Sequence, residues 1–190
     1  MAYRPAVLEA IAGADESALN YDLLEATITH VVDAEATGGP MALLEDWPEV
    51  DFETTAAVDP LPGPGAILVF LPGALEISKL QRQLEASPRL ARALRGGAAH
   101  VLPLHGSLPP AAQAAVFKSY GARGRKIVLA TNVAETSITI ADVTVVIDTG
   151  RMKEMQYDAA GGLSRLANTW VSQASAKQRR GRAGRVRCAA

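Results

Sequence analysis

The chain has 190 residues, 48% of them apolar and 21% charged, which suits one ordinary globular domain with some length left over. A single cysteine, Cys188, excludes an internal disulfide framework and a cysteine-rich zinc site. The longest unbroken apolar run, residues 66–71, is too short to span a bilayer, and no secretory signal pattern opens the chain. We therefore expect an intracellular protein, in the nucleus, the cytoplasm or an organelle, with no membrane partner.

The net charge of −1 conceals two parts of opposite sign. Residues 1–60 hold thirteen Asp and Glu against Arg4 alone, whereas residues 61–190 hold seven acids against eighteen Lys and Arg. A basic body of this kind favours a polyanionic partner, because Lys and Arg bind phosphates and release counterions. A solvated surface of mixed charge has the same composition, so charge alone leaves both interpretations open.

The first predicted element is an amphipathic helix at residues 17–35, which Ser17 or Asn20 could cap. The apolar residues that recur at helical spacing are Leu24, Ile28, Val31 and Val32. From residue 37 to residue 65 the pattern gives way to scattered acids, glycines and prolines, which predicts a flexible acidic insertion. We therefore expect three parts: an N-terminal segment (1–36) with the first helix of the domain, the insertion (37–65), and the domain body (66–190).

The domain body alternates between predicted strands and predicted helices. A helix is expected at residues 74–86, with core contacts from Leu75, Leu80 and Leu84, and another from a Ser107 cap through Tyr120. The predicted strands are residues 66–71, 100–104, 126–130 and 143–147. Strands that alternate with helices form βαβ units, so we expect an α/β fold with a mainly parallel sheet covered on both faces. Functional residues of such sheets gather at the carboxyl ends of the strands.

Two segments near the carboxyl end have patterns of their own. Residues 151–171 alternate on either side of Gly161-Gly162, which predicts a β-hairpin. If residues 178–185 are helical, Gln178, Arg182 and Arg185 share one face. Two glycines in this segment cost about 1 kcal/mol each relative to alanine, which predicts close approach of a backbone or ligand. Arginine is suited to phosphoryl groups, although a basic tail that binds RNA loosely remains the alternative.

Four segments together resemble, in order and spacing, the motifs of the C-terminal RecA-like domain of DEAH/RHA-family RNA helicases. They are Ile67-Leu-Val-Phe-Leu-Pro-Gly73, residues 104–117, Leu129-Ala-Thr-Asn-Val-Ala-Glu-Thr-Ser-Ile-Thr-Ile140, and Gln178-Arg-Arg-Gly-Arg-Ala-Gly-Arg185. The resemblance runs from about residue 19 to residue 186, interrupted by the acidic insertion. It implies a RecA-like three-layer αβα sandwich with a protruding β-hairpin, which in this family projects toward RNA and the next domain.

The resemblance also implies roles for individual residues. Arg182 and Arg185 match arginine fingers that reach the γ-phosphate of ATP, and Gln178 matches the glutamine beside the attacking water. Thr139 matches a position near the nucleotide ribose, although Ala141 stands where many relatives have an acid. The residues that match RNA-binding positions are Gly73 through its main chain, Thr131, Asn132, His105 and Arg179. For His105, a structural role with the side chain hydrogen-bonded to the backbone remains an alternative to RNA contact. For Arg179, packing of the helix remains an alternative.

The chain lacks the other half of a helicase motor. No Gly-Lys pair and no Asp-Glu-x-His sequence occurs in it, so ATP and Mg²⁺ are expected to be held mainly by a first RecA-like domain outside this chain. We expect these 190 residues alone to be inactive. The chain also stops soon after the last arginine, so we expect a domain truncated at its C-terminus, with helical accessory domains as further partners.

The leading prediction is therefore the second motor lobe of an ATP-dependent RNA helicase, gripping the backbone of single-stranded RNA. A non-catalytic RNA-binding or regulatory module made of one RecA-like lobe is the alternative. A related DNA helicase or translocase is a third, because backbone contacts alone discriminate weakly between RNA and DNA.

Overall fold

The computed structural model describes residues 17–37, 65–120, 124–158 and 163–183, together with Gly13 and Asp15. Its helices are α2 (Tyr21–Thr37), α3 (Ala74–Ala86), α4 (Pro88–Arg95), α5 (Pro110–Gln113), the 3-10 helix η2 (Ala114–Phe117), α6 (Val133–Thr136) and α7 (Gln173–Arg180). Its strands are β1 (Ala66–Phe70), β2 (Ala99–Leu104), β3 (Arg125–Ala130), β4 (Val143–Asp148), β5 (Arg151–Asp158) and β6 (Leu163–Trp170). None of the described helices has the length and apolar character needed to cross a membrane. The predicted acidic insertion, apart from its two end residues, lies outside the described residues and stays a prediction.

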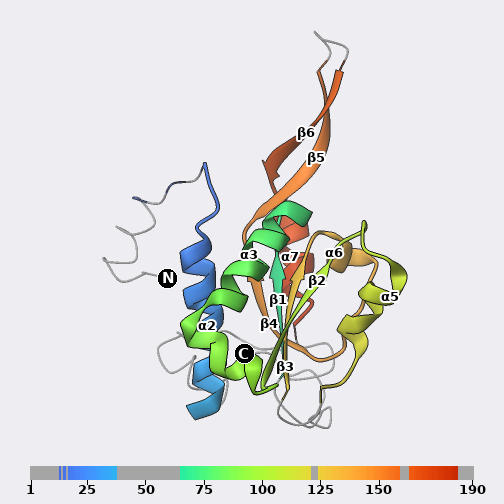
Figure 1. The fold of residues 1–190 in the computed structure, drawn as a ribbon. Coiled ribbons are helices and arrows are strands. Elements are labelled where there is room, and N and C mark those ends of the chain that lie inside the picture. The colour runs from blue at the N-terminus through green and yellow to red at the C-terminus, as the bar shows by residue number, and fades with distance from the viewer. Residues whose placement is uncertain are drawn as a thin grey trace, which may run out of the picture.

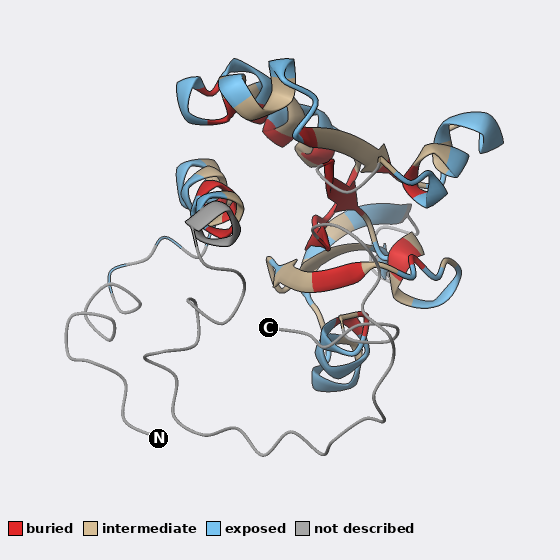
Figure 2. Ribbon diagram, turned by 90° about the horizontal axis from the view of Figure 1, so that it is seen from below, coloured by how far each residue is buried: buried red, intermediate tan, exposed pale blue. Residues whose placement is uncertain are grey.

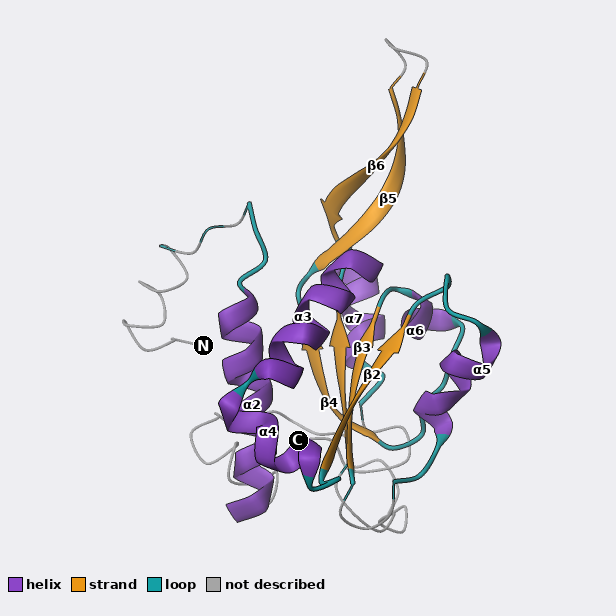
Figure 3. Ribbon diagram, in the orientation of Figure 1, coloured by secondary structure: helices purple, strands orange, loops and turns teal. Residues whose placement is uncertain are grey.

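Strands β1 to β4 form one parallel sheet in the order β2-β3-β1-β4. The two central strands are buried along their whole length, which explains their unalternating apolar sequences. Because successive side chains of a strand point to opposite faces, Ile67 and Val69 enter one core cluster while Leu68 and Phe70 enter the other. Helices cover both faces (Figures 1 and 3). The predicted three-layer α/β sandwich is confirmed.

One face of the sheet is covered by α2, α3 and α4. Helix α2 begins after Asn20, whose side-chain oxygen accepts a hydrogen bond from the N–H of Leu23 at 2.9 Å, so Asn20 acts as the predicted cap. Of the three core leucines predicted for α3, Leu80 and Leu84 are fully buried, but Leu75 is 77% exposed. The prediction for Leu75 was wrong: Ile77, not Leu75, shares the buried stripe with Leu80 and Leu84.

The packing of α2 makes it part of the domain core. Its residues Leu24, Ile28 and Val31 are buried in the same cluster as alternate residues of β1 and β3. At the surface of this contact, Gln83 of α3 donates hydrogen bonds to Asp22 at 2.8 Å and to Glu25 at 2.9 Å. Figure 2 shows that the buried stretches lie on the strands and on the inward sides of the helices.

The other face carries the short helices α5, η2 and α6. The sequence predicted one helix from a Ser107 cap through Tyr120, and this was wrong at both ends. The cap position of α5 is Pro109, and no side chain caps it. The helix tightens into η2 and stops at Phe117. At this end the buried Nζ of Lys126 donates to the carbonyl of Val116 at 2.8 Å, which supplies a partner for a carbonyl of the last turn.

The amino end of β3 holds two buried cations side by side. Lys126 is 5% exposed and pairs with Asp142 across a 2.8 Å contact. Arg125 is 2% exposed, and burial lowers the pKa of its guanidinium to about 10. Arg125 therefore remains protonated at neutral pH, at the end of the sheet opposite the carboxyl ends of the strands.

Strands β5 and β6 form the predicted hairpin, paired antiparallel from Arg151 with Trp170 to Asp158 with Leu163. The hairpin rises from the carboxyl end of β4 and projects from the body (Figure 1). Gly150, just before it, has a φ of 68°, which side chains other than glycine rarely adopt. At the base of the hairpin, Arg151 lies 4.1 Å over the ring of Trp170.

Candidate functional site

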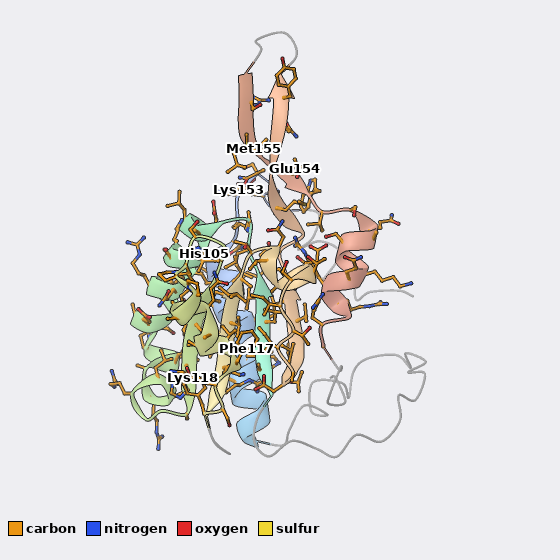
Figure 4. All side chains as sticks on the ribbon, turned by 90° about the vertical axis from the view of Figure 1, so that its right-hand side faces the viewer. His105, Phe117, Lys118, Lys153, Glu154 and Met155 are labelled. Atoms are coloured by element: carbon orange, nitrogen blue, oxygen red, sulfur yellow. The ribbon has the colours of Figure 1, made fainter. Side chains whose placement is uncertain are left out.

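The carboxyl ends of three neighbouring strands bring several predicted residues to one edge of the sheet. Gly73 follows β1, His105 follows β2, and Thr131 follows β3. Because these strands are parallel neighbours, the three segments lie at the same edge. Figure 4 shows His105 at the end of the body from which the hairpin rises, with Lys153 near the hairpin base and Met155 farther out. We call this edge, with Gly73, His105, Thr131 and Asn132, the strand-end edge.

Gly73 is buried at the start of α3, where its carbonyl accepts the N–H of Ile77 at 3.0 Å. Its φ of −166° is extended backbone, so conformation does not require glycine there. A Cβ on Gly73 would meet Glu76 Oε2 at 2.8 Å and Lys153 Nζ at 3.0 Å, the ends of two flexible side chains that would have to shift to make room. These two side chains form an ion pair in which Nζ contacts the two carboxylate oxygens at 2.8 and 2.9 Å.

Thr131 and Asn132 form the turn between β3 and α6. The N–H of Thr131 donates to the carbonyl of Leu104 at 3.1 Å, and its own carbonyl accepts the N–H of Ala134 at 3.2 Å. This turn holds Asn132 with its side chain exposed, immediately before the helix. An exposed amide beside a half-buried hydroxyl can contact a sugar-phosphate backbone without reading its bases.

His105 is half-buried at the end of β2. Its Nδ1 atom is buried and has no hydrogen-bond partner among the described residues. The sequence left open a histidine whose ring is bonded to backbone, and the described residues provide no such bond to Nδ1. The carbonyl of His105, in contrast, accepts the N–H of Leu108 at 3.1 Å.

The arginine-rich segment is helical only in part. Helix α7 is capped by Ser172, whose Oγ accepts the N–H of Ser175 at 3.1 Å, and it ends at Arg180. Gly181 follows as the C-cap, and the N–H of Arg182 bonds to the carbonyl of Arg179 in a tighter turn. The condition under which Gln178, Arg182 and Arg185 would share one helix face is therefore not met, because the helix ends at Arg180. Glycine is better tolerated at a helix end than in a helix interior. Gly184 and Arg185 lie outside the described residues.

The expected close approach at Gly181 is not made by the described part of this chain. A Cβ on Gly181 would meet the carbonyls of Lys177 and Gln178 at 3.4 and 3.5 Å, which is ordinary contact. Gln178 itself is exposed on α7.

Arg182 packs into its own domain. Its side chain is 8% exposed, and its NH1 atom donates to the carbonyl of Ile138 at 3.1 Å. Its NH2 atom donates to the carbonyl of Glu135. Both of these acceptors are main-chain oxygens. Thr139, which is exposed, lines the same crevice as Arg182.

Arg179 occupies a different environment from the exposed Arg180. It is 1% exposed and pairs with two acids, Glu135 at 3.0 Å and Asp148 at 2.8 Å. Sequence analysis left helix packing and RNA contact open for Arg179, and the geometry favours packing. It did not identify either acid as a partner, because Glu135 and Asp148 lie 44 and 31 residues away in the chain.

Six of the predicted site residues fall into two groups. Gly73, His105, Thr131 and Asn132 lie at the strand-end edge. Arg182 and Thr139 share a crevice whose other lining residues are Leu68, Ala134, Ile138, Ile140 and Val143. Asp142 does not line the crevice and is paired with Lys126.

Comparison with known proteins shows the family to which the chain belongs. The profile of the helicase conserved C-terminal domain matches residues 64–187. The chain belongs to this helicase C-terminal domain family. It is 54% identical over 123 residues to human DHX57, which is named as an ATP-dependent RNA helicase; the match covers 65% of this chain and 9% of that protein. It is 43% identical over 179 residues to the DExH-box ATP-dependent RNA helicase DExH1 of Arabidopsis thaliana, covering 94% and 15% respectively.

Among solved structures, the helicase C-terminal domain resembles the crystal structure of the E. coli DExH-box NTPase HrpB. The two are 39% identical with a TM-score of 0.57, and the match covers 66% of this chain and 15% of HrpB. The expected DEAH-type helicase C-terminal domain with its RecA-like fold is thereby confirmed. The chain spans only 9% to 15% of the length of these three proteins.

Proposed function

We propose that this helicase C-terminal domain is the second motor lobe of an ATP-dependent RNA helicase. In this proposal Arg182 and Arg185 stabilise charge on the transferred phosphoryl group, and Gln178 orients the attacking water. ATP and Mg²⁺ are held mainly by a first RecA-like lobe. Among the described residues, no group of three or more His, Cys, Asp or Glu side chains could hold a metal ion. Thr139 lies beside the ribose.

The observation that carries the proposal is that Arg182 and Thr139 line the same crevice, which is too narrow in this structure to hold a water molecule. Ala134 of α6 also lines it, and the exposed Asn132 directly precedes that helix. A motor lobe needs one surface for the nucleotide and another for the nucleic acid. Arg182 donates hydrogen bonds to the main-chain carbonyls of Ile138 and Glu135, and in this proposal a triphosphate replaces these acceptors. The proposal therefore requires Arg182 to leave the carbonyls of Glu135 and Ile138 when a nucleotide-loaded lobe docks.

The same domain grips single-stranded RNA at the strand-end edge in this proposal. The exposed Asn132 and the half-buried Thr131 and His105 present polar groups there, together with main chain at Gly73. These groups suit phosphate and sugar oxygens, which makes the grip independent of base sequence. The hairpin stands beside this edge (Figure 4), and helical accessory domains of the parent protein are its further expected neighbours.

The test uses a chimeric HrpB in which this domain replaces the matching residues. ATP hydrolysis by the chimera is measured with and without RNA. Arg182→Ala is expected to lower turnover by about 10³-fold or more, because an arginine finger acts on the transition state. Arg180→Ala is the matched control, since Arg180 is an exposed arginine on α7. Turnover within about threefold of the parent protein for Arg182→Ala would exclude the finger. A folded chimera without ATPase activity would also count against the proposal.

One observation favours the alternative, a non-catalytic RNA-binding module. Both Arg179 and Arg182 direct their hydrogen bonds into the domain. In that case Asn132→Ala weakens RNA binding by the isolated chain, while Arg182→Ala changes no rate in the chimera. Comparing RNA with DNA of the same sequence in the binding assay tests the third possibility, a DNA translocase.

A further inference from the structure

Arg179 is the largest of the fully buried side chains. Burying a guanidinium is costly unless it is paired and hydrogen-bonded. Two carboxylates meet this need from different parts of the chain: Arg179 Nε contacts Glu135 Oε2 at 3.0 Å, and Arg179 NH1 contacts Asp148 Oδ1 at 2.8 Å. The guanidinium carbon also lies 4.8 Å from the ring centre of Phe70. A buried planar cation with two separate anionic partners holds three segments in one fixed geometry.

Each carboxylate is fastened by a second donor. The other oxygen of Glu135, Oε1, accepts the hydroxyl of Ser175 on α7 at 2.5 Å. Asp148 Oδ1 accepts the N–H of Gly150 at 2.9 Å, at the turn that leads into the hairpin. The cluster of Arg179, Glu135, Asp148 and Ser175 therefore joins α6, α7 and the hairpin base. We call it the Arg179 cluster.

Glu135 connects the two groups of candidate site residues directly. Its N–H bonds to the carbonyl of Asn132 at 2.9 Å, at the strand-end edge. Its own carbonyl accepts a hydrogen bond from Arg182, and its carboxylate holds Arg179. One residue thus touches the exposed turn, the crevice and α7. A shift of α6 by a fraction of an ångström would therefore change the contacts of the turn, the crevice and α7 together, because packed and ion-paired contacts do not deform continuously.

We infer that Arg179 is a positioning residue that couples the strand-end edge to the arginine-bearing end of α7. The inference rests on the proposed function, because it takes the strand-end edge to bind RNA and α7 to carry the group that acts on ATP. RNA bound at the strand-end edge restricts the motion of α6. Through the Arg179 cluster, the motion of α7 and of the hairpin base is then restricted as well. Arg179 itself contacts neither RNA nor nucleotide.

The experiment measures amide hydrogen exchange of the full 190-residue chain, with and without a saturating uridine oligonucleotide. In the unchanged chain, RNA is expected to slow exchange in two segments, residues 131–136 and residues 173–180. Coupling between sites is usually at least about fivefold, so α7 should slow by about that factor. In Arg179→Lys, which keeps the charge but loses the fork that reaches both acids, the first segment should still slow and the second should not.

Two controls separate coupling from a loss of stability. Ile127→Val removes one methylene from the buried centre of β3, away from the cluster, and should leave transmission to residues 173–180 intact. Arg180→Lys makes the same chemical change at the exposed neighbour and should also leave it intact. If Arg179→Lys does not fold, Glu135→Gln replaces it, since the amide keeps the shape of the carboxylate while weakening its bond to Arg179.

The outcomes are distinct. Protection of both segments in Arg179→Lys, or in Glu135→Gln, overturns the coupling role of Arg179. Protection confined to residues 131–136 in the unchanged chain also overturns it, while the RNA grip of the proposed function survives. An unchanged chain that binds no uridine oligonucleotide contradicts that RNA grip, and the inference then falls with it. The inference is supported if RNA no longer protects residues 173–180 in the cluster variants but still protects them in the two controls.

Discussion

The ion pair between Lys153 and Glu76 fixes the hairpin base on α3, and it allows a quantitative prediction. The two side chains are 22% and 18% exposed, and Nζ contacts both carboxylate oxygens. Lys153→Met keeps most of the apolar stem but removes the charge. It leaves the Glu76 carboxylate mostly buried without its cation.

The magnitude follows from distance and burial. Unit charges about 4 Å apart attract by about 4 kcal/mol at an effective dielectric constant of about 20. Desolvation and loss of side-chain freedom offset much of this attraction, and exposed pairs retain only about 0.2–1 kcal/mol. For a pair that is four-fifths buried with two contacts, we expect a coupling energy of about 1–2 kcal/mol. In a domain of this size, 1 kcal/mol corresponds to about 2–4 °C in Tm.

The assay is a double-mutant cycle of Lys153→Met and Glu76→Gln, followed by urea unfolding and by exchange of the β5 amides. Because the hairpin projects from the body, part of the loss should appear as faster exchange in β5 rather than in global unfolding. Lys177→Met, at an exposed lysine of α7, should change stability by less than about 0.5 kcal/mol. If the change in unfolding free energy of the double variant equals the sum for the two single variants within about 0.3 kcal/mol, the reasoning is refuted. The pair would then contribute no more than an exposed surface pair.

Three further predictions concern the fold. Leu80→Ala should cost about 2–5 kcal/mol in denaturant unfolding, whereas Leu75→Ala should stay within about 0.5 kcal/mol, because only Leu80 is buried. Equal losses would contradict the burial pattern. Asn20→Ala should cost about 0.5–2 kcal/mol through loss of the α2 cap, with Asn20→Ser retaining most of the stability. Gly150→Ala should destabilise the chain by about 1 kcal/mol or more and speed exchange at the hairpin base, since φ is positive and the Trp170 ring lies 3.3 Å from the added Cβ. An unchanged exchange rate would show that the turn can relax.

The parallel sheet could be predicted from the sequence because its signal is local. Central strands such as β1 and β3 are buried on both faces, so their residues are apolar without alternation. Helix ends depend on distant partners and were predicted less well. The helix after Pro109 stops near a carbonyl that is bonded by Lys126, ten residues further on, and no local pattern reveals such a bond. Helix α4 was missed, although the Ser87-Pro88 pair at its start is a recognisable helix-initiation signal.

The candidate site could be predicted in its residue types but not in its pairings. Strand-end positions identified Gly73, His105 and Thr131, since parallel strands bring their carboxyl ends together. Sequence could not distinguish the buried Arg179 from the exposed Arg180, because adjacent residues of one type differ only in which face of α7 they occupy. The acids that pair with Arg179 are fixed by tertiary packing alone.

Helix α2 has a practical consequence for anyone who isolates this domain. The helicase profile begins at residue 64, after the helix, yet α2 contributes three buried side chains to the cluster that holds Ile67 and Leu80. A polypeptide started at residue 64 would expose those inner apolar surfaces to water and should be prone to self-association. A soluble preparation therefore needs α2 together with Asn20, its cap.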